Sequence, residues 1–347
     1  MDRFIGLDAH VSSCTLAVVG GSGRKIRLDV VETQASALVA YVQGVAWPKR
    51  LCFEEGTLSE WLYELLSPHV TEVVVMGQNQ RRQGPKSDAR DALGLAQRLR
   101  VGDTGLHVCK DGGHYQRLRA LTRSYTKLKR DQTRLKNRIV WLYHSRGVHP
   151  DTPSVYHATR RQEWIVQCPA ALRPALQLHY EALDALAPVV AHCEQQLVEQ
   201  VASEPIAKVL MTCPGIGPVR AAQVLTTVIQ PARFRTKRQF WSYSGLGIET
   251  RSSSDWVQLQ GHWTRANVAQ CRGLSRRHNR TLKEVFKGAA MVVSARLNTE
   301  HPLRRYYDNL LGKGIKPNLA QLTLARKLAA VLLAMWKQQQ EFNPSMI

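Results

Sequence analysis

The sequence predicts a fold that is α/β at the N-terminus and all-α beyond it. Runs rich in β-branched residues alternate with amphipathic stretches up to about residue 100, and leucines recur at heptad spacing from Leu118 onward. A chain of 347 residues is long enough for more than one domain with its own core. We therefore predict three parts, at residues 1–108, 109–203 and 204–347.

The N-terminal part begins with apolar, β-branched runs separated by polar turns, which predict a three-stranded meander within residues 3–33. Helices and strands then alternate: a helix at 35–46, a strand at 50–55, a helix at 58–68, a strand at 71–77 and a helix at 87–100. Three antiparallel strands followed by alternating helix and strand is the order of the ribonuclease-H-like fold. We therefore predict a ribonuclease-H-like domain over residues 1–108.

The middle part, residues 109–203, reads as a helical coiled-coil stalk. Its seam consists of Leu118, Leu121, Tyr125, Leu128, Gln132, Leu135, Ile139 and Leu142. A second long helical stretch, residues 174–201, could pack on this seam or on a partner subunit, and Pro188 predicts a kink in it.

The last part is predicted to be mainly helical. Residues 213–228 resemble a helix-hairpin-helix element, whose turn presents backbone amides to a phosphate, although a purely structural turn fits the same glycines. Basic helices at 276–297 and 319–337 close the chain.

The charge balance predicts a polyanionic partner. Lys plus Arg exceeds Asp plus Glu by 48 to 27, which gives a formal charge of +21. We find no run of about 18 apolar residues and no leader-like N-terminus, so we expect a cytoplasmic, nucleoid-associated protein without a membrane partner. The seven cysteines are scattered and form no CxxC pair, which indicates reduced thiols.

Four acids in the first domain are candidate metal ligands. Asp8 lies inside the first strand, Glu54 ends the fourth, and Asp88 and Asp91 lie three apart at the start of a helix. In a ribonuclease-H-like sheet these positions are adjacent, and converging carboxylates favour Mg²⁺, with Mn²⁺ as the alternative. Two such ions could hold the attacking and leaving oxygens of a phosphodiester in line.

Simpler interpretations of these acids remain. Asp88 is also explained as a first-turn acid favoured by the helix dipole, and Asp91 as a partner of Arg90 or Lys86. Glu55 could replace Glu54. The interpretation without a metal is weakest for Asp8, because an unpaired acid inside a strand is costly to bury.

Basic residues of the stalk are candidate contacts to nucleic acid. A solvated helix face is the alternative, but acids for compensating i,i+4 pairs are nearly absent, so a phosphate backbone is the better partner. The candidates are Arg117, Arg119, Arg123, Lys127, Arg130, Arg134 and Arg138. Arg81, Arg82 and Lys86 precede the acidic pair and could hold a strand at the metal site.

The ordered motifs of the chain resemble those of the bridge-RNA-guided insertion-sequence transposase family. They are FIGLDAHV, LCFEEGT, PKSDARDALGLA, CPGIGPVRAAQVL and FWSYSGLGIETRSSS. The resemblance implies an N-terminal RuvC-like domain carrying four acids, namely Asp8, Glu54, Asp88 and Asp91, and a C-terminal transposase domain carrying a serine. It also implies donor and target DNA, a noncoding bridge RNA, and a dimer that forms a tetramer on DNA.

Counting from Gly245, the resemblance places the family's serine at Ser253. The chain departs from the family pattern in having Ile248 where proline is common and Ser254 where glycine is usual, so Ser252 and Ser254 are the neighbouring alternatives. A serine hydroxyl that attacks a phosphodiester forms a covalent phosphoserine and conserves the bond energy for rejoining. The alternatives to this recombinase are a metal-dependent nuclease or junction resolvase that uses water, and a non-catalytic RNA-binding protein.

Overall fold

The computed structural model describes residues 2–77, 87–104, 108, 113–252, 256–265, 269–275 and 278–347. It divides the chain into two compact units, Met1–His114 and Tyr115–Ile347. Each unit is described by itself below.

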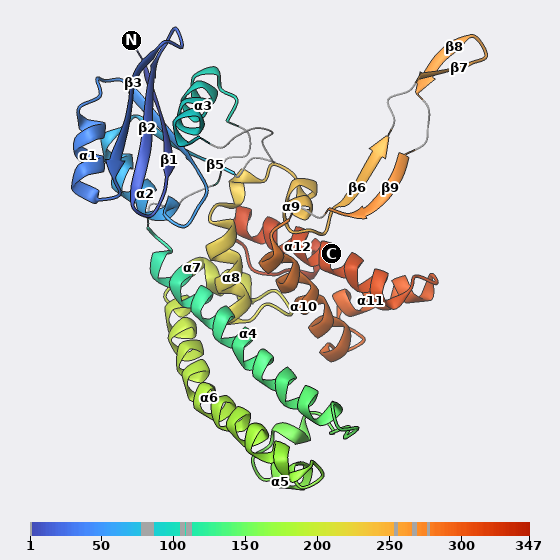
Figure 1. The fold of residues 1–347 in the computed structure, drawn as a ribbon. Helices are drawn as coiled ribbons and strands as arrows, with labels where there is room; N and C mark the ends of the chain where they lie inside the picture. Colours follow the sequence, from blue (N-terminus) through green and yellow to red (C-terminus); the bar gives the residue numbers. More distant parts are fainter. Residues whose placement is uncertain are drawn as a thin grey trace. The chain divides into compact units, whose positions relative to one another are not determined.

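The N-terminal unit is built on a five-stranded mixed sheet in the order β3-β2-β1-β4-β5 (Figure 1). Strand β1 pairs antiparallel with β2 and parallel with β4, β2 pairs antiparallel with β3, and β4 pairs parallel with β5. The strands are β1 (Arg3–Ala9), β2 (Ser13–Gly20), β3 (Lys25–Glu32), β4 (Lys49–Glu54) and β5 (Glu72–Met76). The ribonuclease-H-like order predicted from the sequence is confirmed.

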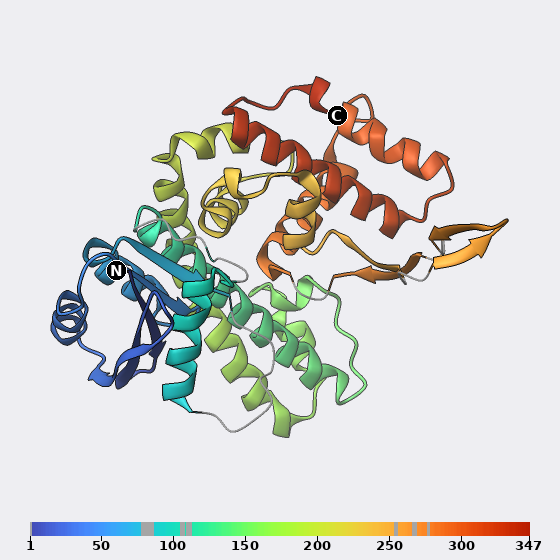
Figure 2. The same cartoon turned by 90° about the horizontal axis from the view of Figure 1, so that it is seen from above.

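Helices cover both faces of this sheet, because alternate strand residues point to opposite sides (Figure 2). Ile5 and Leu7 pack on one side with α1 (Ala35–Gln43) and α2 (Ser59–Leu66), and Phe4 packs on the other with α3 (Asp88–Val101). The even-numbered positions of β1 therefore face α3.

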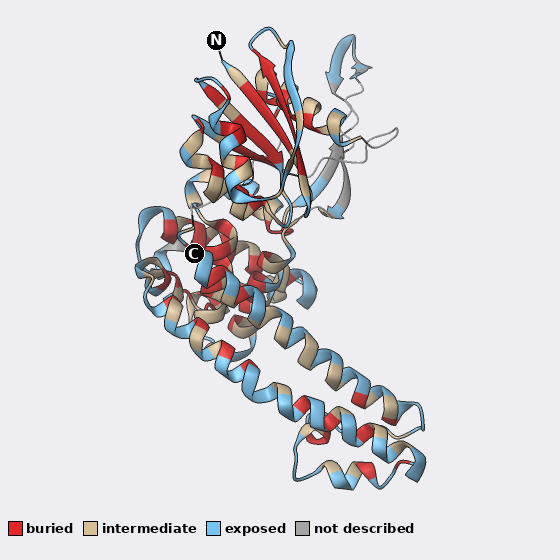
Figure 3. Cartoon of the chain, turned by 60° about the vertical axis from the view of Figure 1, so that its left-hand side comes forward, coloured by how far each residue is buried: buried red, intermediate tan, exposed pale blue. Residues whose placement is uncertain are grey.

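The C-terminal unit begins with an antiparallel helical hairpin of α4 (Gln116–His144) and α6 (Arg173–Ala202). The predicted seam lies between these two helices: Leu118 shares a core with residues of α6 at one end, and Ile139 shares another at the far end (Figure 3). Of the two packing partners expected for the seam, the structure therefore shows the second helix of the same chain. Helix α6 continues through Pro188 and curves.

Six further helices of this unit pack around one core. They are α7 (Pro205–Met211), α8 (Pro218–Val228), α9 (Lys237–Tyr243), α10 (Arg280–Arg296), α11 (Pro302–Gly312) and α12 (Pro317–Gln338). Helix α5 (Arg161–Ile165) contributes Ile165 to the separate core at the far end of the hairpin. This unit also has 3₁₀ turns at Ser154–Tyr156, Ala170–Leu172, Pro231–Arg233 and Pro344–Met346, and the N-terminal unit has one at Ser67–His69. Against the sequence expectation, α12 is long and apolar enough to cross a membrane; 56% of its apolar window is buried inside the chain. It is the central helix of this core.

Four short strands interrupt the helices, in a part of the chain that the sequence predicted to be mainly helical. Strand β6 (Ile248–Ser252) pairs with β9 (Ala269–Leu274), and β7 (Trp256–Leu259) pairs with β8 (His262–Arg265).

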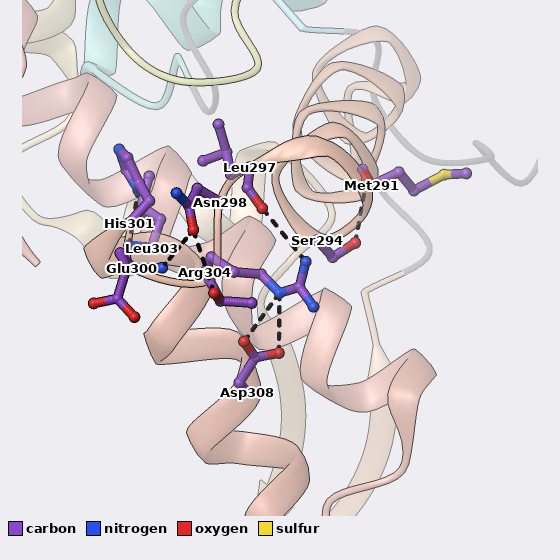
Figure 4. A network of polar contacts seen from close by, with 10 residues as sticks. Met291, Ser294, Leu297, Asn298, Glu300, His301, Leu303, Arg304 and Asp308 are labelled. Carbon is purple, nitrogen blue, oxygen red and sulfur yellow. Dashed lines mark hydrogen bonds and ion pairs between the residues drawn. The ribbon is translucent and has the colours of Figure 1, made fainter.

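The turn from α10 to α11 is held by side-chain hydrogen bonds (Figure 4). Arg304 binds both carboxylate oxygens of Asp308 at 3.0 Å and donates to the Leu297 carbonyl at 3.5 Å, while the Asn298 side chain accepts from the Glu300 amide. These bonds fix the start of α11 relative to the end of α10.

Candidate metal centre and serine-bearing strand

A glycine allows α3 to approach β1 very closely. A Cβ atom on Gly6 would lie 2.1 Å from the carbonyl oxygen of Ala92 and 2.4 Å from the amide nitrogen of Ala96. Only glycine on the strand and small residues on the helix fit this distance. Asp8 is two residues beyond Gly6 on the same face, so the close approach brings it to the first turn of α3.

Three side chains converge at that point. His10 Nε2 lies 3.5 Å from an oxygen of Asp8 and 3.4 Å from an oxygen of Asp88. One donor atom from each residue lies within 4.8 Å of the other two. The three side chains are 23%, 40% and 49% exposed for Asp8, His10 and Asp88, so the cluster opens to solvent on the side of α3.

Backbone bonds just after β1 hold His10 in place. Its amide donates to the carbonyl of Ser13 at 3.0 Å, and its carbonyl accepts the hydroxyl of Thr33 at 2.7 Å. The chain therefore turns tightly at His10 and returns along β2. His10 is not among the ligands predicted from the sequence; the signal that could have found it is a metal-ligating side chain two positions after a strand acid, on the same face.

Glu54 and Asp91 lie around this cluster. Glu54 is the last residue of β4 and shares the α3 face with Cys52, whose thiol donates to the Leu95 carbonyl at 3.2 Å. Asp91 lies in the first turn of α3 with Asp88. Among the described residues, the donor atoms of these two acids do not join the group within 4.8 Å. The alternation of β4 favours Glu54 over Glu55, which follows the strand.

The donor set fits a divalent metal ion. Oδ2 of Asp8 is buried and makes no hydrogen bond within the described part of the chain, so a lone pair is available to a cation. Carboxylate oxygens suit Mg²⁺ and Mn²⁺, and an imidazole nitrogen is a further ligand for transition metals. The helix dipole of α3 favours its first-turn acids without a metal, and the same acids remain ligands when one binds.

The predicted basic residues of α4 divide into two groups. Arg119 is buried, 6% exposed, and does not share the solvent face. The exposed ones are Arg117, Arg123, Lys127, Arg130, Arg134 and Arg138. The last five recur at spacings of four and three, opposite the seam, and we call them the α4 stripe. Arg134 pairs with Asp131 at 2.8 Å; within the residues that the structure describes, the other four form no ion pair.

Ser253 lies outside the described residues, as do Ser254 and the predicted contacts Arg81, Arg82 and Lys86. The described strand β6 ends at Ser252 and begins directly after the turn Gly245–Gly247. Gly245 has φ +67°, and a Cβ there would lie 2.5 Å from the ring of His278, so this turn requires glycine.

Helix α12 anchors this turn. Arg326 donates to the Leu246 carbonyl at 2.6 Å, and Nε1 of Trp241 donates to the Arg326 carbonyl at 2.8 Å. These bonds join residues 80 and 85 positions apart and fix where β6 begins.

The cysteines match their expected reduced state where they are described. Cys14, Cys52, Cys168, Cys193 and Cys213 are free and buried. Burial raises the pKa of the Cys213 thiol to about 12, so this side chain is a core residue.

Comparison with known proteins identifies both regions. Residues 207–308 match the family described as Transposase IS116/IS110/IS902, and residues 5–142 match a transposase model of the DEDD type of IS110. The chain belongs to the IS110/IS116/IS902 transposase family. The DEDD match covers β1, β4 and α3, which carry the four predicted acids, and the second match covers the turn that precedes β6.

Three relatives of this transposase family align with the chain. The chain is 33% identical over 142 residues to an uncharacterized insertion element IS110 protein of Streptomyces coelicolor, covering 41% of the chain and 31% of the relative. It is 26% identical over 152 residues to an uncharacterized insertion element IS116 protein of Streptomyces clavuligerus, covering 44% and 34%. A probable family 20 transposase of Pseudomonas aeruginosa is 24% identical over 269 residues, covering 76% and 75%. The chain thus spans about a third of the first two relatives.

Proposed function

We propose that the chain is a transposase that cuts and rejoins DNA strands. The convergence of Asp8, His10 and Asp88 at the end of β1, in a domain that matches the DEDD type, carries this proposal. These residues, with Glu54 and Asp91 beside them, would hold a divalent ion, Mg²⁺ or Mn²⁺. When bound, the ion supplies positive charge for the developing charge on the phosphate oxygens.

In the proposed reaction Ser253 is the nucleophile. Its hydroxyl oxygen forms a bond to phosphorus, the bond from phosphorus to the leaving sugar oxygen breaks, and the hydroxyl proton passes to that oxygen. Attack by the hydroxyl of a second strand reverses these changes and joins the new strand. The phosphoserine conserves the bond energy, so the reaction needs no other energy source.

Denaturing gels of labelled DNA test this proposal. A protein-linked strand is expected with the natural chain and is lost in Ser253→Ala, while Asp8→Asn abolishes cleavage and spares binding. Ser252→Ala is the matched control and retains the linked strand. A linked strand in Ser253→Ala that disappears in Ser252→Ala would transfer the role to Ser252.

A metal-dependent nuclease or junction resolvase that uses water is the second candidate. It is favoured by the position of the acid cluster entirely within the unit Met1–His114. Free hydroxyl and phosphate ends produced by Ser253→Ala would support it. Unchanged activity of Asp8→Asn would instead leave a non-catalytic RNA-binding protein.

We also propose that a noncoding bridge RNA supplies sequence specificity. The α4 stripe presents regularly spaced cations, which suit the phosphate backbone of a nucleic acid. It lacks the polar side chains with which a recognition helix reads base edges. Sequencing of the RNA that purifies with the protein tests this. One abundant discrete RNA is expected; heterogeneous RNA together with sequence-specific cleavage by RNA-free protein contradicts it.

Self-association to a dimer, and to a tetramer on DNA, is the last part of the proposal. Strand exchange needs nucleophiles on two duplexes. The α4 seam packs within the chain, so we assign the dimer surface to the outer face of α6, where Leu178 is 65% and Val189 is 51% exposed on the same side of the helix. Light scattering of Leu178→Glu is expected to show a monomer where the natural chain shows a dimer; a monomeric natural chain contradicts the proposal.

A further inference from the structure

Two lysines share one hollow between α9 and α12. Lys237, the first residue of α9, and Lys327, in the middle of α12, both line a hollow of about 490 Å³. This volume lies in the usual range for ligand pockets, ~300–1,000 Å³. Trp241 and Tyr306 also line it, and Nζ of Lys237 lies 5.8 Å from the centre of the Trp241 ring.

The two lysines of this hollow have no acidic partner within the described part of the chain. Neither Lys237 nor Lys327 forms an ion pair with a described acid. Burial and the like charge of Lys237 both lower the pKa of Lys327. An anion in the hollow would relieve the repulsion between the two ammonium groups and replace part of their lost hydration.

A second hollow, of about 260 Å³, adjoins the first. The two share Trp241 and Arg326, and the second is also lined by Arg238 and by Ile248, the first residue of β6. We call the pair of hollows the α9–α12 cleft. It carries four cationic side chains from two helices and leads to the strand that precedes Ser253.

We propose that the α9–α12 cleft binds the phosphate backbone of the DNA strand that is to be cut, next to β6, the β-strand that precedes Ser253 in the sequence. The inference rests on the proposed function, because it takes Ser253 as the residue that this DNA strand must reach. The lysines and arginines are suited to consecutive phosphates, and the rings of Trp241 and Tyr306 are suited to the exposed faces of unpaired bases. The α10–α11 turn, held by Arg304, fixes the helix that presents Tyr306 (Figure 4).

The salt dependence of binding tests the cleft. Full-length protein carrying Asp8→Asn is titrated with a single-stranded DNA oligonucleotide and with a single-stranded RNA of the same sequence, at several salt concentrations. Each phosphate that the protein no longer neutralises lowers the slope of log affinity against log salt by about 0.7 for a single strand. Lys237→Gln with Lys327→Gln is therefore expected to lower the DNA slope by about 1.4.

The matched control is Lys313→Gln with Lys316→Gln, which removes the same charge from exposed positions of the same unit outside the cleft. It is expected to keep the full slope. Lys327→Arg, which preserves the charge, is expected to retain the slope as well, and thermal unfolding of each variant reports any loss of fold.

Three results overturn the assignment: an unchanged DNA slope in the folded cleft variant, a reduced slope confined to RNA, or an equal reduction in the control. Because binding is measured without cleavage, a failure of the Ser253 proposal leaves a separate signature. A reduced DNA slope in the cleft variant, together with an intact protein-linked strand in Ser253→Ala, keeps the phosphate site and rejects only the nucleophile.

Discussion

The acid cluster of the N-terminal unit and the α9–α12 cleft of the C-terminal unit gather charges of opposite sign in different ways. Asp8 and His10 are two residues apart, and a single close approach at a glycine brings Asp88 to them. At the cleft, one hydrogen bond between residues 85 positions apart joins α9 to α12, and one between residues 80 positions apart joins α12 to the turn before β6. The first site therefore depends on backbone packing at one point, and the second on long-range side-chain bonds. Substitutions should separate the two kinds of dependence.

The largest effect is expected for Gly6→Val. Its side chain would meet the backbone of α3 at Ala92 and Ala96, so α3 must move away from β1. Overpacking of this kind costs about 1–3 kcal/mol or more, and we place this case at or above the upper end because the neighbours are backbone atoms. Urea unfolding measures the destabilisation, and Mn²⁺ binding is expected to weaken with it.

Gly21→Val is the control for Gly6→Val, since a Cβ at Gly21 meets no atom within 4 Å and the residue has negative φ. Equal stability of the two variants would contradict the close approach of α3 to β1 as the reason for glycine at position 6.

The next effect is the weaker metal binding of His10→Ala. The imidazole is 40% exposed, so its removal spares the fold, and removal of one ligand is expected to weaken Mn²⁺ binding about 10- to 100-fold, the range seen when supporting residues of metal sites are removed. Calorimetric titration of the full chain with Mn²⁺ gives the dissociation constant, and His69→Ala serves as the control. Unchanged or tighter Mn²⁺ binding by His10→Ala would contradict the assignment of His10 as a ligand.

A smaller effect is expected from the α4 stripe. Lys127→Gln with Arg130→Gln removes two exposed cations, and should lower the salt slope by about 0.7–0.9 for each phosphate that is no longer neutralised. Because the stripe is regular charge on one helix, binding of DNA and of RNA should weaken alike. Lys129→Gln, an exposed cation off the stripe, serves as the control. Weakening of DNA binding alone, with RNA binding unchanged, would contradict this prediction for the α4 stripe.

The smallest effect concerns charges that are already paired. Arg161 donates to both oxygens of Asp184, at 2.6 and 2.7 Å, and lowers the pKa of that carboxyl below its usual 3.8. A depressed acid pKa contributes stability that is fully present above the unfolded value and is lost as pH falls through the folded value. Since Asp184 is 56% exposed, we expect less than about 1 kcal/mol.

The thermal unfolding temperature of the chain should therefore fall between pH 5 and pH 2 by up to about 2 °C more than that of Asp184→Asn. Identical pH profiles of the two proteins would show that this ion pair does not contribute to the stability of the hairpin.

The sequence predicted those parts of the molecule that depend on the local spacing of apolar residues. They include the strand order, α3 with Asp88 and Asp91, and the heptad seam. Alternation and heptad spacing report which side of an element is buried, so Asp8 was visible as an acid on a core-facing strand position. The burial of Arg119 was not, because no spacing along α4 reports which other elements pack around its first turn.

Long-range packing explains the remaining differences. His10 was missed because its role depends on a helix that begins nearly eighty residues later. The strands β6 to β9 are only four to six residues long and contain too few apolar positions to show a clear period. The cleft requires α9 and α12 to be adjacent, and no spacing along the chain reports that adjacency.

The helical hairpin has a further consequence as a spacer of fixed length. Helix α4 has 29 residues and is therefore about 43 Å long, comparable to a dozen or so base pairs of duplex DNA. Separate cores at its two ends prevent α4 and α6 from sliding along one another; at the far end the hydroxyl of Tyr180 lies 3.1 Å from that of Tyr143 and donates to the Val155 carbonyl. Matched insertions of one heptad in both helices would lengthen the hairpin by about 10 Å without changing either core. The span that the hairpin sets is thus a length that evolution or engineering can alter in discrete steps.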